Sequence, residues 1–227
     1  KMNITTLSTE RQKKLFNQGL LFNIHGQYLS KDSKTVFLGI PKNASSFIGE
    51  LLHKNDWNIM LNDENKFINE CTMDGFNPNS VNESIIILND PIKRWISGIS
   101  QYASSIMTQH AVNDTIVIID KNLLDMMFDV IDVDDHTLPQ HYYLDGLYPN
   151  TDKKYFWVNE QLEYNIMKYL ELGTTIAYSH HDDSEIFRNK FKRAIISEMD
   201  ANPSLYEKIK EYYKLDYELI NLVDIQY

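Results

Sequence analysis

The sequence is poor in cysteine and in positive charge, and each shortage excludes a class of protein. The 227 residues include one cysteine, Cys71, so neither an internal disulfide nor a paired-cysteine zinc site is available. A single thiol is typical of a reducing compartment. Lysine and arginine number 22 against 32 aspartates and glutamates, a net charge of −10, which argues against a groove for nucleic acid or a polysulfated glycan. A small anion held in a local basic pocket is compatible with this balance.

Long apolar runs are also missing. No run is long enough to span a bilayer, and the first residues lack the apolar stretch of a signal peptide. We therefore expect a cytoplasmic protein with no membrane partner. A hydrophobic fraction of 43% and a charged fraction of 24% are close to the globular average, so a sizeable core is possible. No repeat or low-complexity linker divides the chain, and we expect a single domain over residues 1–227.

Short apolar runs alternate with amphipathic segments along the chain. The runs predict buried strands at 35–40, 84–89 and 155–158. Helical spacing of apolar residues predicts helices at 45–54, 91–106, 121–131, 160–171, 184–199 and 203–223. The polar stretch 55–84 predicts mainly loop. Strands that alternate with helices indicate an α/β fold with a central parallel sheet flanked by helices.

The first candidate ligand loop follows the strand at 35–40 and has the sequence Ile40-Pro41-Lys42-Asn43-Ala44-Ser45-Ser46. A helix N-terminus offers unpaired backbone N–H groups and the positive end of a dipole, so it favours phosphate-like anions. Lys42 adds a full charge, and the two serines add hydroxyl donors. The loop is not a Walker P-loop, because the glycine pattern before the lysine is missing. The alternative is an ordinary strand–helix turn with a solvated lysine.

The second candidate loop follows the strand at 84–89 and has the sequence Asn89-Asp90-Pro91-Ile92-Lys93-Arg94-Trp95-Ile96-Ser97-Gly98. Asp90 and Pro91 predict the N-cap and first turn of a helix. Arg94 and Ser97 are three residues apart and share one face of it, where a guanidinium beside a hydroxyl suits a phosphate. The alternative is a capped amphipathic helix with an exposed basic face. Since parallel strands end at one edge of a sheet, we expect both loops at the ligand site.

Together the two loops resemble the sulfotransferase superfamily, most closely its carbohydrate-type and Golgi-type branch. The resemblance implies a P-loop-NTPase-like fold and an enzyme that uses 3′-phosphoadenosine 5′-phosphosulfate (PAPS) as co-substrate, releases 3′-phosphoadenosine 5′-phosphate (PAP) and needs no metal. In such enzymes the first loop wraps the 5′-phosphosulfate, with the lysine at the sulfuryl group, and the second loop binds the 3′-phosphate. The residues that the resemblance assigns to the nucleotide are Pro41, Lys42, Asn43, Ala44, Ser45, Ser46, Asn89, Arg94 and Ser97.

The chain departs from the family pattern at Asn89, where the family usually has an arginine. An amide donates a hydrogen bond but brings no charge, a loss of about 1–3 kcal/mol in nucleotide binding unless another cation replaces it. Arg94 is one replacement. A second group of cations lies in the predicted helix at 184–199, and we interpret it as a solvated helix face. Its members are Arg188, Lys190, Lys192 and Arg193.

The resemblance extends to His136-Thr137-Leu138-Pro139-Gln140 and to the closing segment 212–219. Sulfuryl transfer to a hydroxyl needs a base, and His136 is the first candidate because histidine titrates near neutral pH. A structural role for His136 is the alternative, with His53, Glu50 or the acids of 55–84 as the base.

Tyr142, Tyr143 and Tyr148 are candidates for an acceptor cleft. Two polar clusters lack metal-ligand spacing, and we interpret 180–183 as a loop before a helix and the aspartates of 120–135 as a solvated face.

The sequence therefore predicts a sulfotransferase that moves a sulfuryl group from PAPS to a hydroxyl of a carbohydrate or small metabolite. An alternative is a catalytically impaired nucleotide- or glycan-binding protein of the same fold, which Asn89 favours. A small-molecule kinase is a further alternative, which the missing Walker lysine–threonine pair disfavours.

Overall fold

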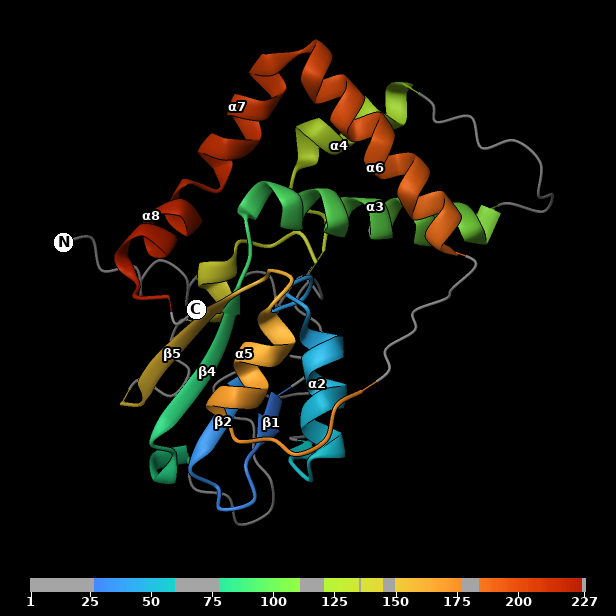
Figure 1. Cartoon of the computed structure of the whole chain (residues 1–227). Coiled ribbons are helices and arrows are strands. Elements are labelled where there is room, and N and C mark those ends of the chain that lie inside the picture. The colour runs from blue at the N-terminus through green and yellow to red at the C-terminus, as the bar shows by residue number, and fades with distance from the viewer. Residues whose placement is uncertain are drawn as a thin grey trace.

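The computed structural model describes residues 27–59, 78–110, 121–134, 136–144, 150–176 and 184–225. These residues form a five-stranded sheet and seven helices (Figure 1). The strands are β1 (Gln27–Leu29), β2 (Thr35–Leu38), β3 (Asn58–Ile59), β4 (Glu83–Leu88) and β5 (Asp152–Trp157). The helices are α2 (Ser45–Lys54), α3 (Pro91–His110), α4 (Lys121–Val130), α5 (Leu162–Tyr169), α6 (Ser184–Ala201), α7 (Pro203–Tyr212) and α8 (Lys214–Leu222), with short 3-10 turns η2 (Pro78–Ser80) and η3 (Gln140–Tyr143).

The sheet has the strand order β3-β1-β2-β4-β5 and is mixed. Its centre, β2-β4-β5, is parallel, and β1 pairs antiparallel with both β2 and β3. The predicted α/β class is confirmed, and the three predicted strands are the parallel ones. The prediction missed the antiparallel edge, because β1 has only three residues, Gln27, Tyr28 and Leu29, and shows no apolar run.

Alternating side chains of the central strands supply both faces of the sheet, as the period of a strand requires. One face buries Phe37, Ile85 and Phe156 against the apolar sides of α2 and α5. The other buries Val36 and Ile86, together with side chains of η3 and α8. Burial on both faces explains why β4 is an uninterrupted apolar run.

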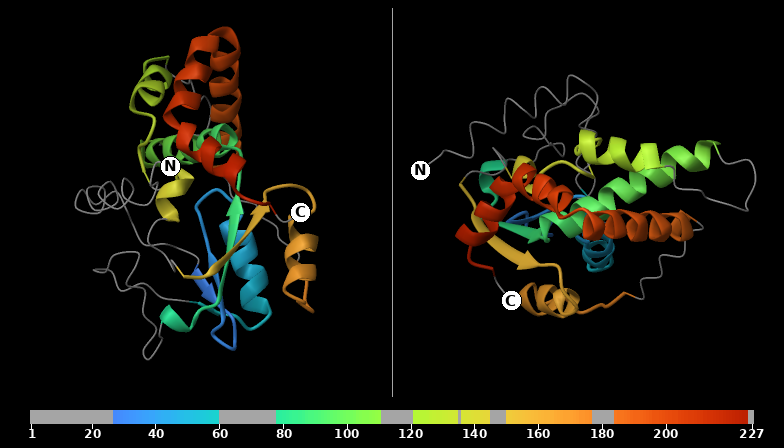
Figure 2. Two further views of the ribbon diagram at one scale, coloured as in Figure 1. Left: turned by 90° about the vertical axis from the view of Figure 1, so that its left-hand side faces the viewer. Right: turned by 90° about the horizontal axis from the view of Figure 1, so that it is seen from above.

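Helices α3, α4, α6 and α7 pack together and stand over the carboxyl ends of the parallel strands (Figure 1). Trp95 of α3 is completely buried there and its ring lies 5.5 Å from that of Phe128 in α4, while Phe191 and Ile195 of α6 complete the same cluster. From above, α6 is seen to pass across α3 (Figure 2). The packing of α3 and α6 therefore brings their polar residues to the edge of the sheet where β2 and β4 end.

The last predicted helix, 203–223, is wrong as a single element, because the chain breaks between α7 and α8 at Tyr213. Tyr213 is completely buried and its hydroxyl donates to the Thr137 carbonyl oxygen, and Asp216, one turn later, is also completely buried. Residues three apart share one face of a helix, and these two side chains face the core at the junction of α7 and α8. In the described part of the chain no helix is long and apolar enough to cross a membrane.

Candidate functional site

The first loop is held in an unusual backbone shape. Lys42 and Ala44 both have left-handed backbone angles, φ 67° and 57°, which cost non-glycine residues roughly 1–2 kcal/mol each. Between them Asn43 is buried, and its Nδ2 donates to the carbonyl oxygen of Ile87 (2.7 Å) and to Oε1 of Gln140 (2.6 Å). These bonds fasten the loop to β4. Ala44 also precedes α2 without a side-chain cap, so no side chain of the cap residue covers the first N–H groups of this helix.

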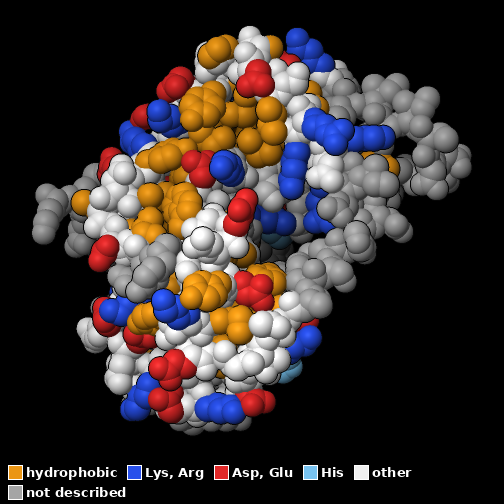
Figure 3. All heavy atoms as spheres, in the orientation of Figure 1, with side chains coloured by type: hydrophobic (Ala, Val, Ile, Leu, Met, Phe, Trp, Pro, Cys, Tyr) orange, Lys and Arg blue, Asp and Glu red, His pale blue; other side chains and the backbone are white. Residues whose placement is uncertain are grey.

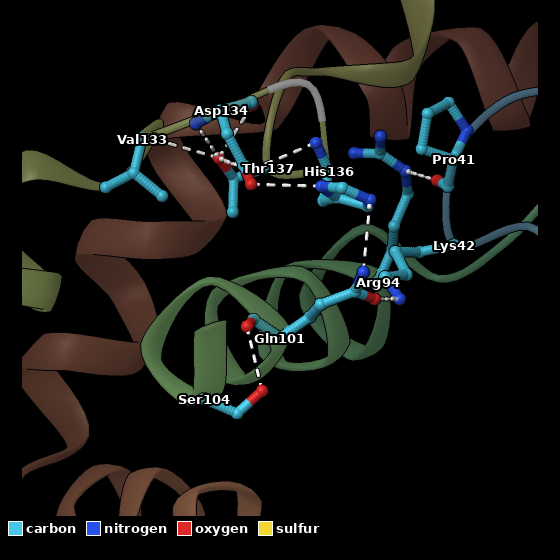
Figure 4. Close-up of polar contacts among 9 residues, drawn as sticks. All are labelled: Pro41, Lys42, Arg94, Gln101, Ser104, Val133, Asp134, His136 and Thr137. Carbon is cyan, nitrogen blue, oxygen red and sulfur yellow. Dashed lines mark hydrogen bonds and ion pairs between the residues drawn. The ribbon is translucent and has the colours of Figure 1, made fainter. Parts of the chain in front are cut away.

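Lys42 extends from this loop to α3. Its ammonium donates to Oε1 of Gln101, as the close-up shows (Figure 4). Burial lowers the pKa of Lys42 to about 8, helped by the positive charges of Arg188, Lys192 and Arg94 and opposed by Asp134. The side chain is therefore still mainly charged at neutral pH. Nearby cations and partial burial give this position a positive potential that an anion would relieve.

The second loop has the predicted N-cap. Its arginine, Arg94, was expected on a helix face open to a phosphate or to solvent, but it is buried. Oδ1 of Asp90 accepts from the backbone N–H of Lys93 (2.9 Å), which confirms the N-cap. Arg94 is completely buried, donates from Nε to the Pro41 carbonyl oxygen (2.9 Å) and from Nη1 to that of Leu138. Arg94 thus ties the first loop to the segment that carries His136. Its binding of a phosphate stays a prediction.

The remaining predicted ligand residues divide into two groups. Asn89 belongs to the framework, since its Nδ2 donates to the Lys42 carbonyl oxygen (3.2 Å) and its Oδ1 accepts from the Asp90 N–H (2.9 Å). Ser97 is half-buried, and its hydroxyl has no hydrogen-bond partner among the described residues. Ser45 is half-buried and Ser46 exposed, both in the first turn of α2. Contact between these serine hydroxyls and a ligand stays a prediction.

His136 forms a pair with Asp134 beside Lys42. Its Nδ1 lies 2.9 Å from Oδ2 of Asp134, and its Nε2 lies 3.5 Å from Nε2 of Gln101 (Figure 4). A carboxylate at Nδ1 favours the tautomer with the proton there and leaves Nε2 as the proton acceptor. Asp134 was interpreted as part of a solvated acidic face, and the structure instead places it at the histidine. In the sequence, the one sign of this pair is that Asp134 lies two positions before His136.

Gly98 allows the histidine segment to approach α3. A Cβ atom at this position would lie 2.8 Å from the carbonyl carbon of His136 and 3.2 Å from Cγ2 of Thr137. The first distance is shorter than real Cβ contacts, and the crowded atom is backbone that has little freedom to move. The absence of a side chain at Gly98 is therefore what brings His136 to Gln101.

Two buried side chains that sequence reasoning did not single out join these segments. Gln140 accepts from the Asn89 N–H (2.9 Å) and from Asn43, and donates to the Asn89 carbonyl oxygen (2.8 Å), so it bridges both loops. Asp216 of α8 accepts from the N–H groups of Gln140 (2.8 Å) and His141 (3.0 Å) and lies 2.7 Å from Nδ1 of His141. Both residues lie in segments that resemble the family, which was the one sequence signal for them.

Of the other candidates for a base, those on α2 lie apart from this group, whereas the acids of 60–77, like Tyr148, lie outside the described residues. Glu50 pairs with Lys54 at 3.5 Å on α2, and His53 lies in the last turn of the same helix, at the opposite end from Lys42. Tyr143 is buried beneath Arg94, 5.8 Å from its guanidinium carbon, and belongs to the core rather than to a cleft. The cluster at 180–183 lies outside the described residues. Within the described residues, no three histidine, cysteine or acidic side chains are grouped to hold a metal.

The basic residues of α6 are not one solvated face, as the sequence suggested. Lys190 and Arg193 are exposed, but Arg188 and Lys192 are half-buried and act electrostatically on Lys42. Figure 3 shows lysine and arginine side chains gathered beside a hollow in this face of the molecule. The acidic protein thus concentrates positive charge at one place, as a small-anion site requires.

Comparison of the chain with protein-family models, with curated proteins and with solved structures finds no match. The geometry of the site and the sequences of its two loops are therefore what indicate a function.

Proposed function

We propose that this chain is a PAPS-dependent sulfotransferase with a P-loop-like fold that acts on a hydroxyl of a carbohydrate or small metabolite. The observation that carries the proposal is the meeting of Lys42 and the Asp134–His136 pair at Gln101, beyond the carboxyl ends of β2 and β4. A cation for the leaving group and a base for the acceptor are the two groups that this reaction needs. Ligands of α/β sheets bind at this edge.

PAPS supplies an activated sulfuryl group whose leaving group is a phosphate. In the proposed step the acceptor oxygen forms a bond to sulfur while the bond from sulfur to the 5′-phosphate oxygen breaks, and the hydroxyl proton moves to Nε2 of His136. Asp134 stabilises the positive imidazolium that results. Lys42 stabilises the negative charge that grows on the phosphate oxygen.

The framework residues have a supporting role in this proposal. We expect the uncapped N-terminus of α2 to offer backbone N–H groups to the 5′-phosphate and the partly exposed hydroxyls of Ser45 and Ser97 to add donors. Arg94, Gln140 and Asp216 hold the loops in place through buried hydrogen bonds. Preorganised donors of this kind stabilise developing charge without having to move during the reaction.

Calorimetry with PAP and with ATP tests the proposal. We expect PAP to bind with micromolar or tighter affinity and ATP to bind more weakly. Lys93→Ala, which removes an exposed charge from the same part of α3, is the control and should leave PAP affinity unchanged. No heat with PAP together with tight ATP binding would overturn the proposal and favour the kinase.

A catalytically impaired binding protein is the second candidate, because Asn89 is engaged with the first loop and brings no charge to the 3′-phosphate. Incubation with PAPS separates it from the enzyme. The enzyme releases PAP, at least by slow transfer to water, whereas the binding protein holds PAPS intact.

A further inference from the structure

Helix α6 carries two kinds of cation. Arg188 and Lys192 are one turn apart and half-buried, whereas Lys190 and Arg193 are exposed. The half-buried pair lies on the helical stripe of Phe191 and Ile195, which are completely buried in the cluster shared with α3. The packing of α6 therefore directs Arg188 and Lys192 toward α3 and Lys42, and the other two toward solvent.

The half-buried pair adds charge where positive charge is already concentrated. Both side chains lie close enough to Lys42 to disfavour its charged form, and the one acid with a comparable influence, Asp134, is engaged by His136. Lys192 forms no ion pair with any of the described residues. Like charges gathered in a partly buried place repel one another, and a bound anion removes this repulsion.

The position of the pair indicates which substrate carries that anion. The ammonium of Lys42 points to Gln101, roughly two turns along α3 from Arg94, and Gln101 contacts His136. Asn89, at the position expected for the 3′-phosphate, instead contacts the backbone of Lys42. Arg188 and Lys192 act on Lys42, and the ammonium of Lys42 meets the proposed base at Gln101, which the acceptor hydroxyl must also reach.

Resting on the proposed function, we propose that the acceptor carries an anionic group near its reacting hydroxyl, and that Arg188 and Lys192 bind this group. A carboxylate, a sulfate or a phosphate has the required chemistry, since guanidinium and ammonium groups donate charge-assisted hydrogen bonds to each. One small anion matches two cations in a chain whose net charge is −10, whereas a long polyanion would be repelled by the rest of the surface.

Inorganic sulfate is a probe that does not depend on the identity of the acceptor. Calorimetry on the full chain saturated with PAP measures its binding to four proteins: wild type, Arg188→Ala/Lys192→Ala, the matched control Lys190→Ala/Arg193→Ala, and Lys42→Ala. We expect sulfate affinity to fall at least tenfold in the Arg188/Lys192 double variant and less than twofold in the control. Glutamine at both positions keeps the side-chain length and serves as a second variant if the alanine protein fails to fold.

Each other result overturns the inference in a distinct way. If sulfate affinity falls in Lys42→Ala but not in the Arg188/Lys192 variant, sulfate binds at the position of the transferred sulfuryl group. The acceptor anion is then bound elsewhere. A tenfold loss of PAP affinity in the Arg188/Lys192 variant means that the pair holds the nucleotide. If PAP fails to bind wild type, the proposed function itself falls, and the acceptor assignment falls with it.

Turnover gives a second readout once PAP binding is established. With PAPS, methyl glucuronide and methyl glucoside form a pair of candidate acceptors that differ in one carboxylate. We expect the anionic member to be sulfated at least tenfold faster by wild type, and the two to react at similar rates with the Arg188/Lys192 variant. A preference for the neutral member in wild type would contradict the inference.

Discussion

The loop after β2 and the loop after β4 share one local plan, a parallel strand that runs into a helix, yet they are stabilised in opposite ways. The first has two left-handed residues, begins an uncapped helix and extends Lys42 into the site. The second is capped by Asp90, and its arginine is completely buried against backbone carbonyls. The first loop thus presents the candidate ligand groups, and the second holds the first in its shape.

This contrast separates residues that bind from residues that position others. The same sequence pattern, a basic residue and a serine after a strand, occurs in both loops, but the exposure of the cation differs. Replacing Lys42 in the first loop is expected to change chemistry with little effect on stability. Replacing Arg94 in the second is expected to destabilise the site.

Replacing Arg94 should have the largest effect of all. Arg94→Ala removes a completely buried side chain and leaves the carbonyl oxygens of Pro41 and Leu138 without their donor, at a cost of about 3–5 kcal/mol in the free energy of unfolding. Urea denaturation measures this, with the exposed neighbour Lys93→Ala as control. If Arg94→Ala is stable but no longer binds PAP, Arg94 contacts the nucleotide directly, and the two loops do not differ in the proposed way.

Replacing Lys42 should reduce turnover rather than stability. We expect Lys42→Ala to slow release of PAP from PAPS by on the order of 100-fold, about 3 kcal/mol, because its ammonium matters most when charge develops on the leaving oxygen. PAP affinity should fall less, since backbone N–H groups still hold the phosphate. Wild-type turnover, or a much lower melting temperature, would show that Lys42 is structural.

Filling the space at Gly98 tests how closely the histidine segment must approach α3. Gly98→Ala should cost about 1–3 kcal/mol in the free energy of unfolding and lower turnover, because the new methyl group pushes the His136 backbone away. Gly173→Ala is the matched control, since a Cβ there meets nothing within 4 Å. Equal behaviour of the two variants would mean that the approach of His136 is not required.

Restoring the missing charge at position 89 should have a smaller, favourable effect. We expect Asn89→Arg to tighten PAP binding about tenfold, or roughly 1.4 kcal/mol, by adding a charged hydrogen bond to the 3′-phosphate. The substitution also removes the bonds of Asn89 to Lys42 and Asp90, and Asn89→Ala measures that loss alone. Weaker binding of the arginine variant than of the alanine variant would place the 3′-phosphate elsewhere.

The pH dependence should show the smallest change. Because the pKa of Lys42 is lowered from 10.5 to about 8 and its charged form is the active one, kcat/KM should fall to half near pH 8 and continue to fall above it. Lys42→Arg keeps its charge at these pH values, so its profile should lack this decline. A wild-type profile that stays flat to pH 10 would contradict the role of Lys42.

Local patterns predicted the elements that local physics determines. The apolar run at 84–89 became β4, Asp90 became the cap, and the helix at 45–54 was correct to the residue. The same reasoning failed for the side chains whose partners are distant. Arg94 is buried because of Leu138, 44 positions away, and Asn43 because of Gln140, 97 positions away.

The site was predicted in part for the same reason. The two loops were located because each is a continuous motif. The role of Asp134 and the division of the α6 cations depend on how α3 and α6 pack, and no short pattern encodes that packing. Polar spacing identified the residues, and their burial separates the framework side chains from the candidate ligand groups.

The bonds from Asp216 to Gln140 and His141 have a consequence for synthesis. These residues are 76 and 75 positions apart, so a ribosome that has made Gln140 needs about 4–15 s more before Asp216 exists. Strand β5 is made early in that interval, so all five described strands exist well before Asp216 can fasten the bridge between the two loops. Until α8 is made, the candidate site is therefore incomplete, and the apolar sheet face that α8 helps to cover is exposed in the nascent chain, where such surface favours aggregation.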